Sequence, residues 1–414
     1  MLASIAVHEA SFRTATDLTA NRIYLDYNAS APLVAQARQA MLAALELDGN
    51  PSSVHAEGRR LRGIIEGARD HVAALIGARP ADVVFTSGAT EANVTVLSQG
   101  WDTVFMSGIE HDSVLAPARM TGARIVELPV ATTGVADAGA IAEHVLLGAK
   151  PIGRAVIALQ MVNNETGVLQ PVAEVAAFAR EHGLICHSDA VQAAGRFAID
   201  FDALGVDTLA LSGHKIGGPK GVGALVIRDG TPISALMTGG GQERRRRAGT
   251  ENLVAIAGFG AAAKVAAERL ADFARIGVLR DRLETGVLQA TPMAVVFGKA
   301  ANRVANTSCI GLAGRSAEIA VIKLDVAGFA VSAGSACSSG KVGASHVLAA
   351  MGAEPEVARG AIRISLGPAT TRDDIEAFLV VWRDINNVSA GSMPRSVHIE
   401  NCGRASMAAS VLGE

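Results

Sequence analysis

The stretch LALSGHKIGGPKGVGALVI, residues 209–227, carries the strongest local signal for the fold. An apolar, strand-like run ends in SGHK at residues 212–215, and a turn rich in Gly and Pro follows. A second β-branched run begins at Gly221. The pattern predicts two strands joined by a turn, with Lys215 presented at the end of the first strand.

This stretch alone leaves two interpretations of Lys215. Lysine ammonium groups usually lie in water, so one interpretation is a surface turn. The other is an amine nucleophile that forms a Schiff base, which needs a lysine whose pKa is lowered by cationic or apolar neighbours. The glycines do not form a nucleotide-binding loop, because Gly218 is followed by Pro219 and Lys220 rather than by Lys and Ser or Thr. The rest of the chain has to distinguish the two interpretations.

The composition excludes several classes of protein. The chain has 414 residues, of which 50% are hydrophobic and 4% aromatic, and its net charge at pH 7 is −3. This length and apolar content predict a globular protein of two or more domains. This slightly negative net charge does not indicate binding to nucleic acid or to an anionic membrane surface. The N-terminus resembles no signal peptide and no stretch approaches the about 18 apolar residues of a spanning helix, so we expect no membrane association.

The cysteines indicate the compartment and argue against a metal. The chain has four of them, at wide and irregular spacing: Cys186, Cys309, Cys337 and Cys402. This spacing fits neither a disulfide framework nor a zinc site. We therefore expect a reducing cytoplasm and no bound metal.

Alternating strands and helices predict an α/β fold. Apolar residues of the segment 56–78 recur at helical spacing up to Gly77, a plausible stop. Residues 82–86 form a β-branched run, and a helix follows from near Thr90. Further strand-like runs lie at 103–111, 123–130, 154–167, 184–192, 207–215 and 221–227. With helical segments such as 171–183 between some of them, they predict a mostly parallel sheet.

The domain organisation follows from these elements. We expect residues 1–21 to form an N-terminal arm and residues 22–32 to join a smaller domain. Residues 33–271 are predicted to form a large domain and residues 272–386 the smaller α+β domain. Residues 387–414 are rich in Ser, Ala and Gly without periodicity, which predicts a loose tail.

Polar residues follow several predicted strands, where open α/β sheets bind their ligands. The turn TSGATE at 86–91 offers backbone N–H groups to a phosphate, although it could be a plain βα loop. Asp189 could cap a helix, or it could keep a pyridine nitrogen protonated. His111 could stack on such a ring or be a core histidine. Asn164 and Gln192 fit as donors to a ring oxygen, and equally as partners of loop backbone.

Six segments, taken together, identify a family: VNNETG, HSDAVQ, SGHKIGGPKGVGAL, GGGQERRRRAGT, VSAGSACSSG and IRISLG. They occur in the order found in cysteine desulfurases of iron–sulfur cluster assembly and nitrogen fixation, and the chain resembles these enzymes from about Tyr24 to Thr371. The resemblance implies a pyridoxal-phosphate enzyme of the class V aminotransferase group with an aspartate-aminotransferase-like fold (fold type I). It also implies a homodimer, a large domain that binds the cofactor and a small domain that carries Cys337.

The resemblance implies a role for each matching residue. Lys215 would form the Schiff base with the cofactor, Asp189 would pair with its pyridine nitrogen, and His111 would stack on its ring. The phosphate would be bound by Ala89, Thr90, Ser212 and His214, and by Thr250 from the other subunit. Asn164 and Gln192 would hold the ring face and the phenolic oxygen. Arg363, with Asn164, would bind the substrate, because the planar fork of an arginine meets a carboxylate bidentately.

The resemblance assigns the sulfur chemistry to Cys337. The surrounding SAGSACSSG is rich in Gly, Ser and Ala, which suits an exposed loop rather than a core. A thiolate there could attack the sulfur of bound L-cysteine and leave L-alanine and a persulfide. The loop resembles that of the subgroup which passes the persulfide to a partner, a sulfur acceptor or cluster scaffold protein. The other three cysteines are expected to be structural.

Alternatives remain open at this point. A relative of the same fold could be a selenocysteine lyase or a class V aminotransferase, and the tail leaves room for a sulfur-relay scaffold with weak catalysis. The four arginines at 244–247 indicate a local anion site or a subunit contact rather than nucleic acid. Arg245 and Arg246 depart from the family pattern, as does Val94, which replaces an amide.

Overall fold

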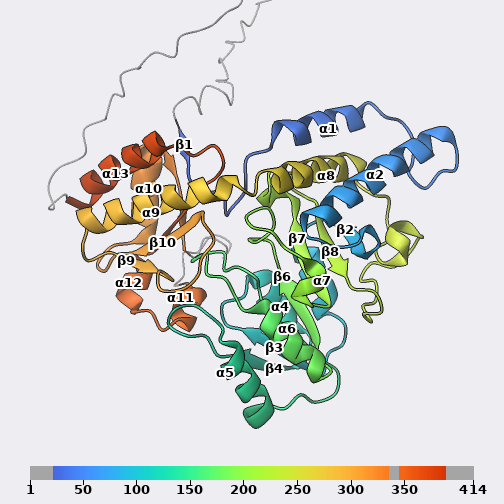
Figure 1. Cartoon of the computed structure of the whole chain (residues 1–414), viewed down its shortest axis with the longest axis horizontal. Helices are drawn as coiled ribbons and strands as arrows, with labels where there is room; N and C mark the ends of the chain where they lie inside the picture. The colour runs from blue at the N-terminus through green and yellow to red at the C-terminus, as the bar shows by residue number, and fades with distance from the viewer. Residues whose placement is uncertain (1–21, 335–344, 388–414) are drawn as a thin grey trace, which may run out of the picture.

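The computed structural model describes residues 22–334 and 345–387 (Figure 1). The predicted N-terminal arm and the predicted tail after Asn387 lie outside these ranges. So do Cys337 with the loop predicted to carry it, and Cys402.

A seven-stranded sheet organises the larger part of the chain (Figure 1). Its strands, in spatial order, are β2 (Val83–Thr86), β8 (Gly223–Ile227), β7 (Thr208–Ser212), β6 (Ile185–Asp189), β5 (Ala155–Ala158), β3 (Thr103–Ser107) and β4 (Arg124–Leu128). Strand β8 is antiparallel to both of its neighbours, and the other pairings are parallel. All residues of β2, β3, β5, β7 and β8 are buried, as expected for a sheet covered on both faces. The predicted mostly parallel α/β sheet is confirmed.

Helices cover both faces of this sheet. The helices in this part are α1 (Ala35–Leu45), α2 (Ala56–Leu75), α3 (Ala89–Leu97), α4 (Asp112–Met120), α5 (Ala138–Glu143), α6 (Val172–Glu181), α7 (Phe201–Leu204) and α8 (Leu253–Glu268). Val83 and Phe85 of β2 pack into one apolar cluster with α2, α6 and α8. Val84, between them, packs into another with α3 and α4. This alternation follows from the two-residue period of a strand.

A second sheet of four antiparallel strands lies beside the first part (Figure 1). Its order is β12 (Ser332–Ala333), β13 (Ile362–Ser365), β10 (Thr307–Gly311) and β9 (Val295–Phe297). The helices here are α9 (Asp272–Ala290), α10 (Ala317–Val326), α11 (His346–Ala350), α12 (Pro355–Arg359) and α13 (Arg372–Asn387). Side chains of α9 and α13, such as Leu283 and Phe378, share a core with this sheet. The predicted domain boundaries remain a prediction.

The N-terminal strand links the start of the chain to this second core. Strand β1 (Ile23–Tyr24) pairs in parallel with β11 (Phe329–Ala330), and Leu25 is buried in the core of the second sheet. The chain then crosses from the second core to α1 (Figure 1). Residues 28 and 29 of this crossing segment contact Lys215, which follows strand β7 of the large sheet. Within the described residues, no helix combines the length and the apolar character needed to cross a membrane.

The predicted strand, turn and strand around Lys215 are confirmed. Strand β7 continues into the short helix η3 (Gly213–Lys215), and the chain returns as β8. The turn needs Gly217, whose φ of 85° is in the left-handed region that side chains disfavour. A Cβ there would also lie 2.7 Å from Val34 Cγ1. The remaining short helices are η1 (Pro80–Asp82), η2 (His144–Gly148) and η4 (Gln242–Arg245).

Candidate active site

A cavity of about 540 Å³ opens where the parallel strands of the large sheet end. Asp189 is the last residue of β6 and Ser212 the last of β7, while His111 follows β3. Ten of the predicted site residues line this cavity: Ala89, Thr90, His111, Asn164, Asp189, Gln192, Ser212, His214, Lys215 and Arg363. The fold thus brings together residues that are up to 274 positions apart in the sequence, from Ala89 to Arg363.

The start of helix α3 forms one end of the cavity. Gly88 is the N-cap residue, and Ala89 and Thr90 begin the helix. The first N–H groups of a helix have no partner within the helix, so they are available to an anion. Strand β8 lies directly against this turn, because a Cβ on Gly223 would be 2.7 Å from the Gly88 carbonyl carbon. This end of the cavity is suited to a phosphate group.

His214 lies beside the same end as a neutral imidazole. Burial lowers its pKa to about 4, and the positive charges of Lys215 and Lys220 act in the same direction. Its Nδ1 lies 3.3 Å from Ser30 Oγ. A neutral imidazole still offers one N–H donor, so His214 can bind a phosphate by a hydrogen bond rather than by its charge.

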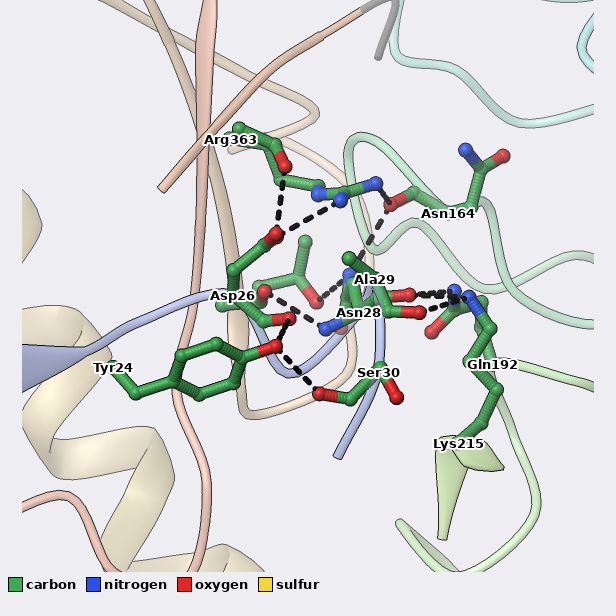
Figure 2. A network of polar contacts seen from close by, with 12 residues as sticks. Tyr24, Asp26, Asn28, Ala29, Ser30, Asn164, Gln192, Lys215 and Arg363 are labelled. Carbon is green, nitrogen blue, oxygen red and sulfur yellow. Dashed lines mark hydrogen bonds and ion pairs between the residues drawn. The ribbon is translucent and has the colours of Figure 1, made fainter. Parts of the chain in front are cut away.

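Lys215 is held by the backbone of the segment that crosses between the two sheets (Figure 2). Its Nζ donates to the carbonyl oxygens of Asn28 at 2.5 Å and Ala29 at 3.1 Å. Asn28 is itself buried and fixed from the second sheet. Its N–H donates to Ser365 Oγ at 2.9 Å, and its Nδ2 donates to Thr307 Oγ1 at 2.9 Å. The position of the amine therefore depends on both sheets.

Gln192 points at the same backbone (Figure 2). Its Nε2 donates to the carbonyl oxygen of Asn28 at 3.0 Å. Its Oε1 is buried and has no hydrogen-bond partner among the described residues. A buried amide oxygen without a partner is costly. This side of the cavity therefore favours a ligand that donates a hydrogen bond to Gln192 Oε1, or one that makes the Gln192 side chain adopt another orientation.

Asp189 is oriented by two hydrogen bonds. Val191 N–H donates to its Oδ1 at 2.9 Å, and Asn93 Nδ2 donates to its Oδ2 at 2.9 Å. The oxygen of the Asn93 amide lies 2.9 Å from Nε2 of His187, which therefore carries the proton. His187 is fully buried and its pKa is lowered to about 4, because burial disfavours the charged imidazole. Neutral His187 thus orients the side-chain amide of Asn93, and this amide in turn orients the carboxylate of Asp189.

Asn93 connects this aspartate to His111 as well. Its Nδ2 also donates to Ser113 Oγ at 2.9 Å, and Ser113 Oγ lies 2.8 Å from His111 Nδ1. Ser113 N–H also donates to that nitrogen, at 3.1 Å. Because Nδ1 accepts, the proton of a neutral His111 is on Nε2. One asparagine therefore sets the orientation of both Asp189 and the imidazole.

Arg363 reaches the cavity from the second sheet. It is part of β13 and is only 2% exposed. Its Nη2 donates to Asp26 Oδ1 at 3.0 Å and its Nη1 to the backbone oxygen of Asn164 at 3.2 Å (Figure 2). Its Nε is buried without a partner in the described part of the chain. The guanidinium is thus fixed while retaining a donor for a further acceptor.

Glu165 lies between the two ends of the segment that contains Cys337. Ser345 Oγ donates to Glu165 Oε2 at 2.6 Å, and a Cβ on Gly334 would lie 3.1 Å from the same oxygen. Burial raises the pKa of Glu165 to about 7. Glu165 follows Asn164, which lines the cavity, so Glu165 connects both sides of the segment 335–344 to a neighbour of a cavity residue.

Two predicted site residues are not brought to this cavity by the described chain. Cys337 lies outside the described residues. Thr250 is exposed and does not line the cavity. Its role in binding the phosphate of a second subunit stays a prediction.

The arginine-rich segment before Thr250 is anchored by Glu243. The buried Glu243 carboxylate accepts from Arg69 Nη1 at 2.7 Å and from Phe85 N–H at 2.8 Å. Arg247 Nε donates to Glu91 Oε1 at 2.9 Å, so the last arginine is paired with α3. Glu243, Arg244 and Arg245 have φ values of 44°, 55° and 65°. This run of three left-handed residues is strained backbone.

Sequence reasoning missed several residues that organise the site. Asn28, Asn93, Ser113 and His187 had no role in the sequence analysis, although His187 lies in the HSDAVQ segment and Asn93 follows the TSGATE turn. A polar residue at the end of a strand or in the first turns of a helix is the only local signal they carry. Their partners lie far along the chain, so that signal does not distinguish them from capping residues.

The donor set fits pyridoxal phosphate. The Lys215 amine could hold its aldehyde, the Asp189 carboxylate its ring nitrogen, and the start of α3 its phosphate. The fold and this site define an enzyme of the aspartate-aminotransferase fold type, which uses that cofactor. Comparison with known proteins agrees, since the family described as Aminotransferase class-V matches residues 23–378. The chain belongs to this family.

Individual relatives show which members of this family the chain is similar to in sequence and structure. A cysteine desulfurase of Cereibacter sphaeroides is 41% identical over 87% of this chain and 94% of its own. The cysteine desulfurase IscS of Dictyoglomus turgidum is 39% identical over 88% of this chain and 94% of its own. The solved structure of a NifS-like protein from Rickettsia africae superposes with a TM-score of 0.82 at 33% identity, covering 89% of this chain and all of the other. Within the family the chain is a cysteine desulfurase, which confirms the predicted family, fold type, enzyme class and cofactor.

Proposed function

We propose that the cavity around Lys215 is where this enzyme removes sulfur from L-cysteine, and that Cys337 accepts that sulfur. The observation that carries the proposal is the convergence of the Lys215 amine, the Asp189 carboxylate, the His111 imidazole and the Arg363 guanidinium on one cavity. Bound pyridoxal phosphate supplies an electron sink for the bonds broken at the substrate. The protein supplies binding, orientation and proton transfer.

Lys215 holds the cofactor and then moves a proton. The carbonyl oxygens of Asn28 and Ala29 fix its Nζ in the cavity. With L-cysteine bound in the cavity, this Nζ would take the proton from the substrate Cα. Asp189 would keep the ring nitrogen of the cofactor protonated, and the hydrogen bond from Asn93 holds its carboxylate in place for that role.

Arg363 positions the substrate by its carboxylate. The side chain is fixed by Asp26 and by the backbone oxygen of Asn164, so little conformational entropy is lost when it binds a further oxygen. His111 carries its proton on Nε2, as argued from the contacts of its Nδ1. It can therefore donate a proton to the substrate during the reaction and recover it afterwards.

Cys337 accepts the sulfur by a nucleophilic displacement at the sulfur atom of L-cysteine. Its thiolate attacks the substrate sulfur, an S–S bond forms, and the Cβ–S bond breaks. The electron pair of the broken bond stays on carbon, which gains a proton and becomes the methyl group of L-alanine. The terminal sulfur of the resulting persulfide is oxidised relative to cysteine, while the carbon is reduced. Support for this role comes from Glu165, which contacts the residues on both sides of the segment 335–344.

The wider setting is also part of the proposal. We expect a cytoplasmic homodimer in which Thr250 of one subunit completes the phosphate site of the other. The large unit of residues 33–271 binds the cofactor, residues 272–386 form the small unit, and a sulfur acceptor or cluster scaffold protein receives the persulfide for iron–sulfur cluster assembly or related sulfur trafficking. The exposed position of Thr250 is compatible with contact to a second chain.

Lys215→Ala is the direct test of the cofactor site. The wild-type protein should show a visible absorption band from bound pyridoxal phosphate, and the variant should lose it. Lys220→Ala is the matched control, because Lys220 also lines the cavity but is exposed. A colourless wild-type protein that does not respond to added cofactor would refute the proposal. Alanine release that requires a keto acid would instead indicate an aminotransferase.

A further inference from the structure

Lys215 also lines a second cavity. This cavity has a volume of about 450 Å³, and among the residues that the structure describes it shares only Lys215 with the first. Its walls come from the crossing segment at 31–34, the turn before Arg196, the junction of α8 with α9, and the loop at 366–369. It therefore lies where the two parts of the chain meet, beside the lysine of the active site. The proposed function gives this space no role.

Arg196 is an unpaired charge in the wall of this second cavity. The residue is 6% exposed. No hydrogen bond or ion pair joins its guanidinium to another described residue, and its Nη1 is buried without a partner. Burial lowers its pKa to about 9, and the charge of Arg363 acts in the same direction. That pKa still leaves the side chain positively charged at neutral pH.

A buried guanidinium without a counter-charge is unusual. Buried charges in proteins are as a rule paired, because desolvation without a partner is costly. The charged residues that face this cavity are Arg196, Lys215 and Arg269 against the single carboxylate of Asp272. Asp272 is exposed and forms no ion pair with Arg196 in the described chain. The balance of charge in the cavity is therefore positive and favours an anion.

The other walls indicate what kind of anion fits. Val265, Ala266, Phe273 and Leu366 supply apolar surface, and Asn306 supplies an amide. A small inorganic anion would leave that apolar surface without contacts. A molecule with a carboxylate at one end and an apolar body uses both kinds of wall, and the planar fork of an arginine matches a carboxylate bidentately.

We propose that this second cavity binds a small organic carboxylate, with its carboxylate on Arg196 and its body against the apolar wall of α8 and α9. The site is independent of the chemistry proposed for the first cavity, and it adjoins that cavity through Lys215. A bound carboxylate supplies the counter-charge that Arg196 lacks. The ligand is therefore recognised by charge at one end and by shape at the other.

Calorimetric titration of the holoenzyme with benzoate tests this proposal, and benzamide serves as a neutral probe of the same shape. Benzoate should bind at one site per chain, at least tenfold more tightly than benzamide. Arg196→Met should weaken benzoate binding at least tenfold and leave benzamide unchanged. Arg269→Gln is the matched control, because this exposed arginine lines the same cavity, and it should change benzoate binding less than threefold. Equal binding of both probes, or benzoate binding that survives in Arg196→Met, would overturn the proposal.

Thermal unfolding gives a second readout that does not depend on activity. Without any carboxylate, Arg196→Met should raise the unfolding temperature, because it removes an unpaired buried charge. With benzoate, the temperature should rise for the wild-type protein and not for the variant. A variant that unfolds at a lower temperature than the wild-type protein without ligand would show that Arg196 has a structural partner, against the proposal. Benzoate binding lost in Arg363→Gln but kept in Arg196→Met would assign the ligand to the first cavity, with the same consequence.

Discussion

The side-chain amide of Asn93 donates to the carboxylate of Asp189 over 2.9 Å, and this contact links two chain segments that are 96 residues apart. His187 fixes the direction of the amide from the opposite side. Asn93 thereby helps to fix the orientation of the Asp189 carboxylate. The same amide reaches His111 through Ser113, so one residue positions both the side chain that we expect at the ring nitrogen of the cofactor and the one that we expect on the face of its ring.

Replacing Asn93 should therefore weaken the cofactor site without removing a residue that contacts the cofactor. Asn93→Ala removes one buried hydrogen-bond partner from each of His187, Ser113 and Asp189, and a lost buried partner costs about 1–3 kcal/mol. We expect cofactor affinity to fall by at least tenfold, as measured by titration of the absorption band. Ser113→Ala removes one link only and should have a smaller effect. Unchanged affinity in Asn93→Ala would show that Asp189 is positioned by other contacts.

Glu110 should make stability depend on pH. Its carboxyl group is fully buried, and burial raises its pKa from 4.5 to about 8. The folded protein thus binds a proton that the unfolded chain releases above pH 4.5. The stabilisation is complete below pH 4.5 and is lost as the pH rises through about 8. The loss amounts to roughly 5 kcal/mol.

Glu110→Gln separates this effect from all other titrations. Glutamine is the neutral isostere, and its Oε1 can still accept from Ser107 Oγ and Gln160 N–H, as Glu110 does. We expect the wild-type free energy of unfolding to fall relative to the variant between pH 5 and about pH 8, measured by urea denaturation. Parallel curves for the two proteins over this range would contradict the buried, protonated Glu110.

Arg245→Gly should stabilise the protein. Arg245 is exposed and has a φ of 65°, a conformation that costs a non-glycine residue about 1–2 kcal/mol. Glycine adopts it freely, so we expect a gain of about 1 kcal/mol in the free energy of unfolding. Arg246→Gly is the control, because its φ of −92° is ordinary, and it should destabilise. A loss of stability in Arg245→Gly would mean that its side chain contributes more than its backbone costs.

Ser345→Ala should slow sulfur transfer and spare cofactor binding. The hydroxyl of Ser345 donates to Glu165 Oε2 and also caps helix α11 through Leu348 N–H. Losing both contacts loosens the chain where it returns from the segment with Cys337. We expect the rate of sulfide release from L-cysteine to fall about tenfold, a free-energy change of about 1.4 kcal/mol. Ser345→Thr keeps the hydroxyl and should retain most activity, while the absorption band should be the same in both variants.

The sequence predicted the parts of the site that follow a local rule. Asp189 and Lys215 were expected at strand ends because apolar runs precede them, and the carboxyl ends of strands meet at one edge of the sheet. The turn after Lys215 was predicted from its glycines and Pro219. The strain at Glu243, Arg244 and Arg245 was not predicted, because backbone angles are not visible in residue types.

The residues that hold the catalytic groups in place could not be predicted in the same way. Asn28 lies 337 positions from Ser365 and 279 from Thr307, and these distant contacts fix the carbonyl that binds Lys215. Arg196 resembles any surface arginine in the sequence, since only the packing of two distant segments buries it. Long-range packing, rather than local propensity, determines both.

Locating the sulfur after one turnover tests the central claim most directly. The holoenzyme is mixed with L-cysteine, its thiols are blocked, and its peptides are analysed by mass spectrometry. We predict one added sulfur atom on the peptide with Cys337, one L-alanine released for each persulfide, and neither persulfide nor sulfide release in Cys337→Ser, which keeps its absorption band. An added sulfur on Cys186, Cys309 or Cys402 instead, or alanine formation undiminished in Cys337→Ser, would contradict the account.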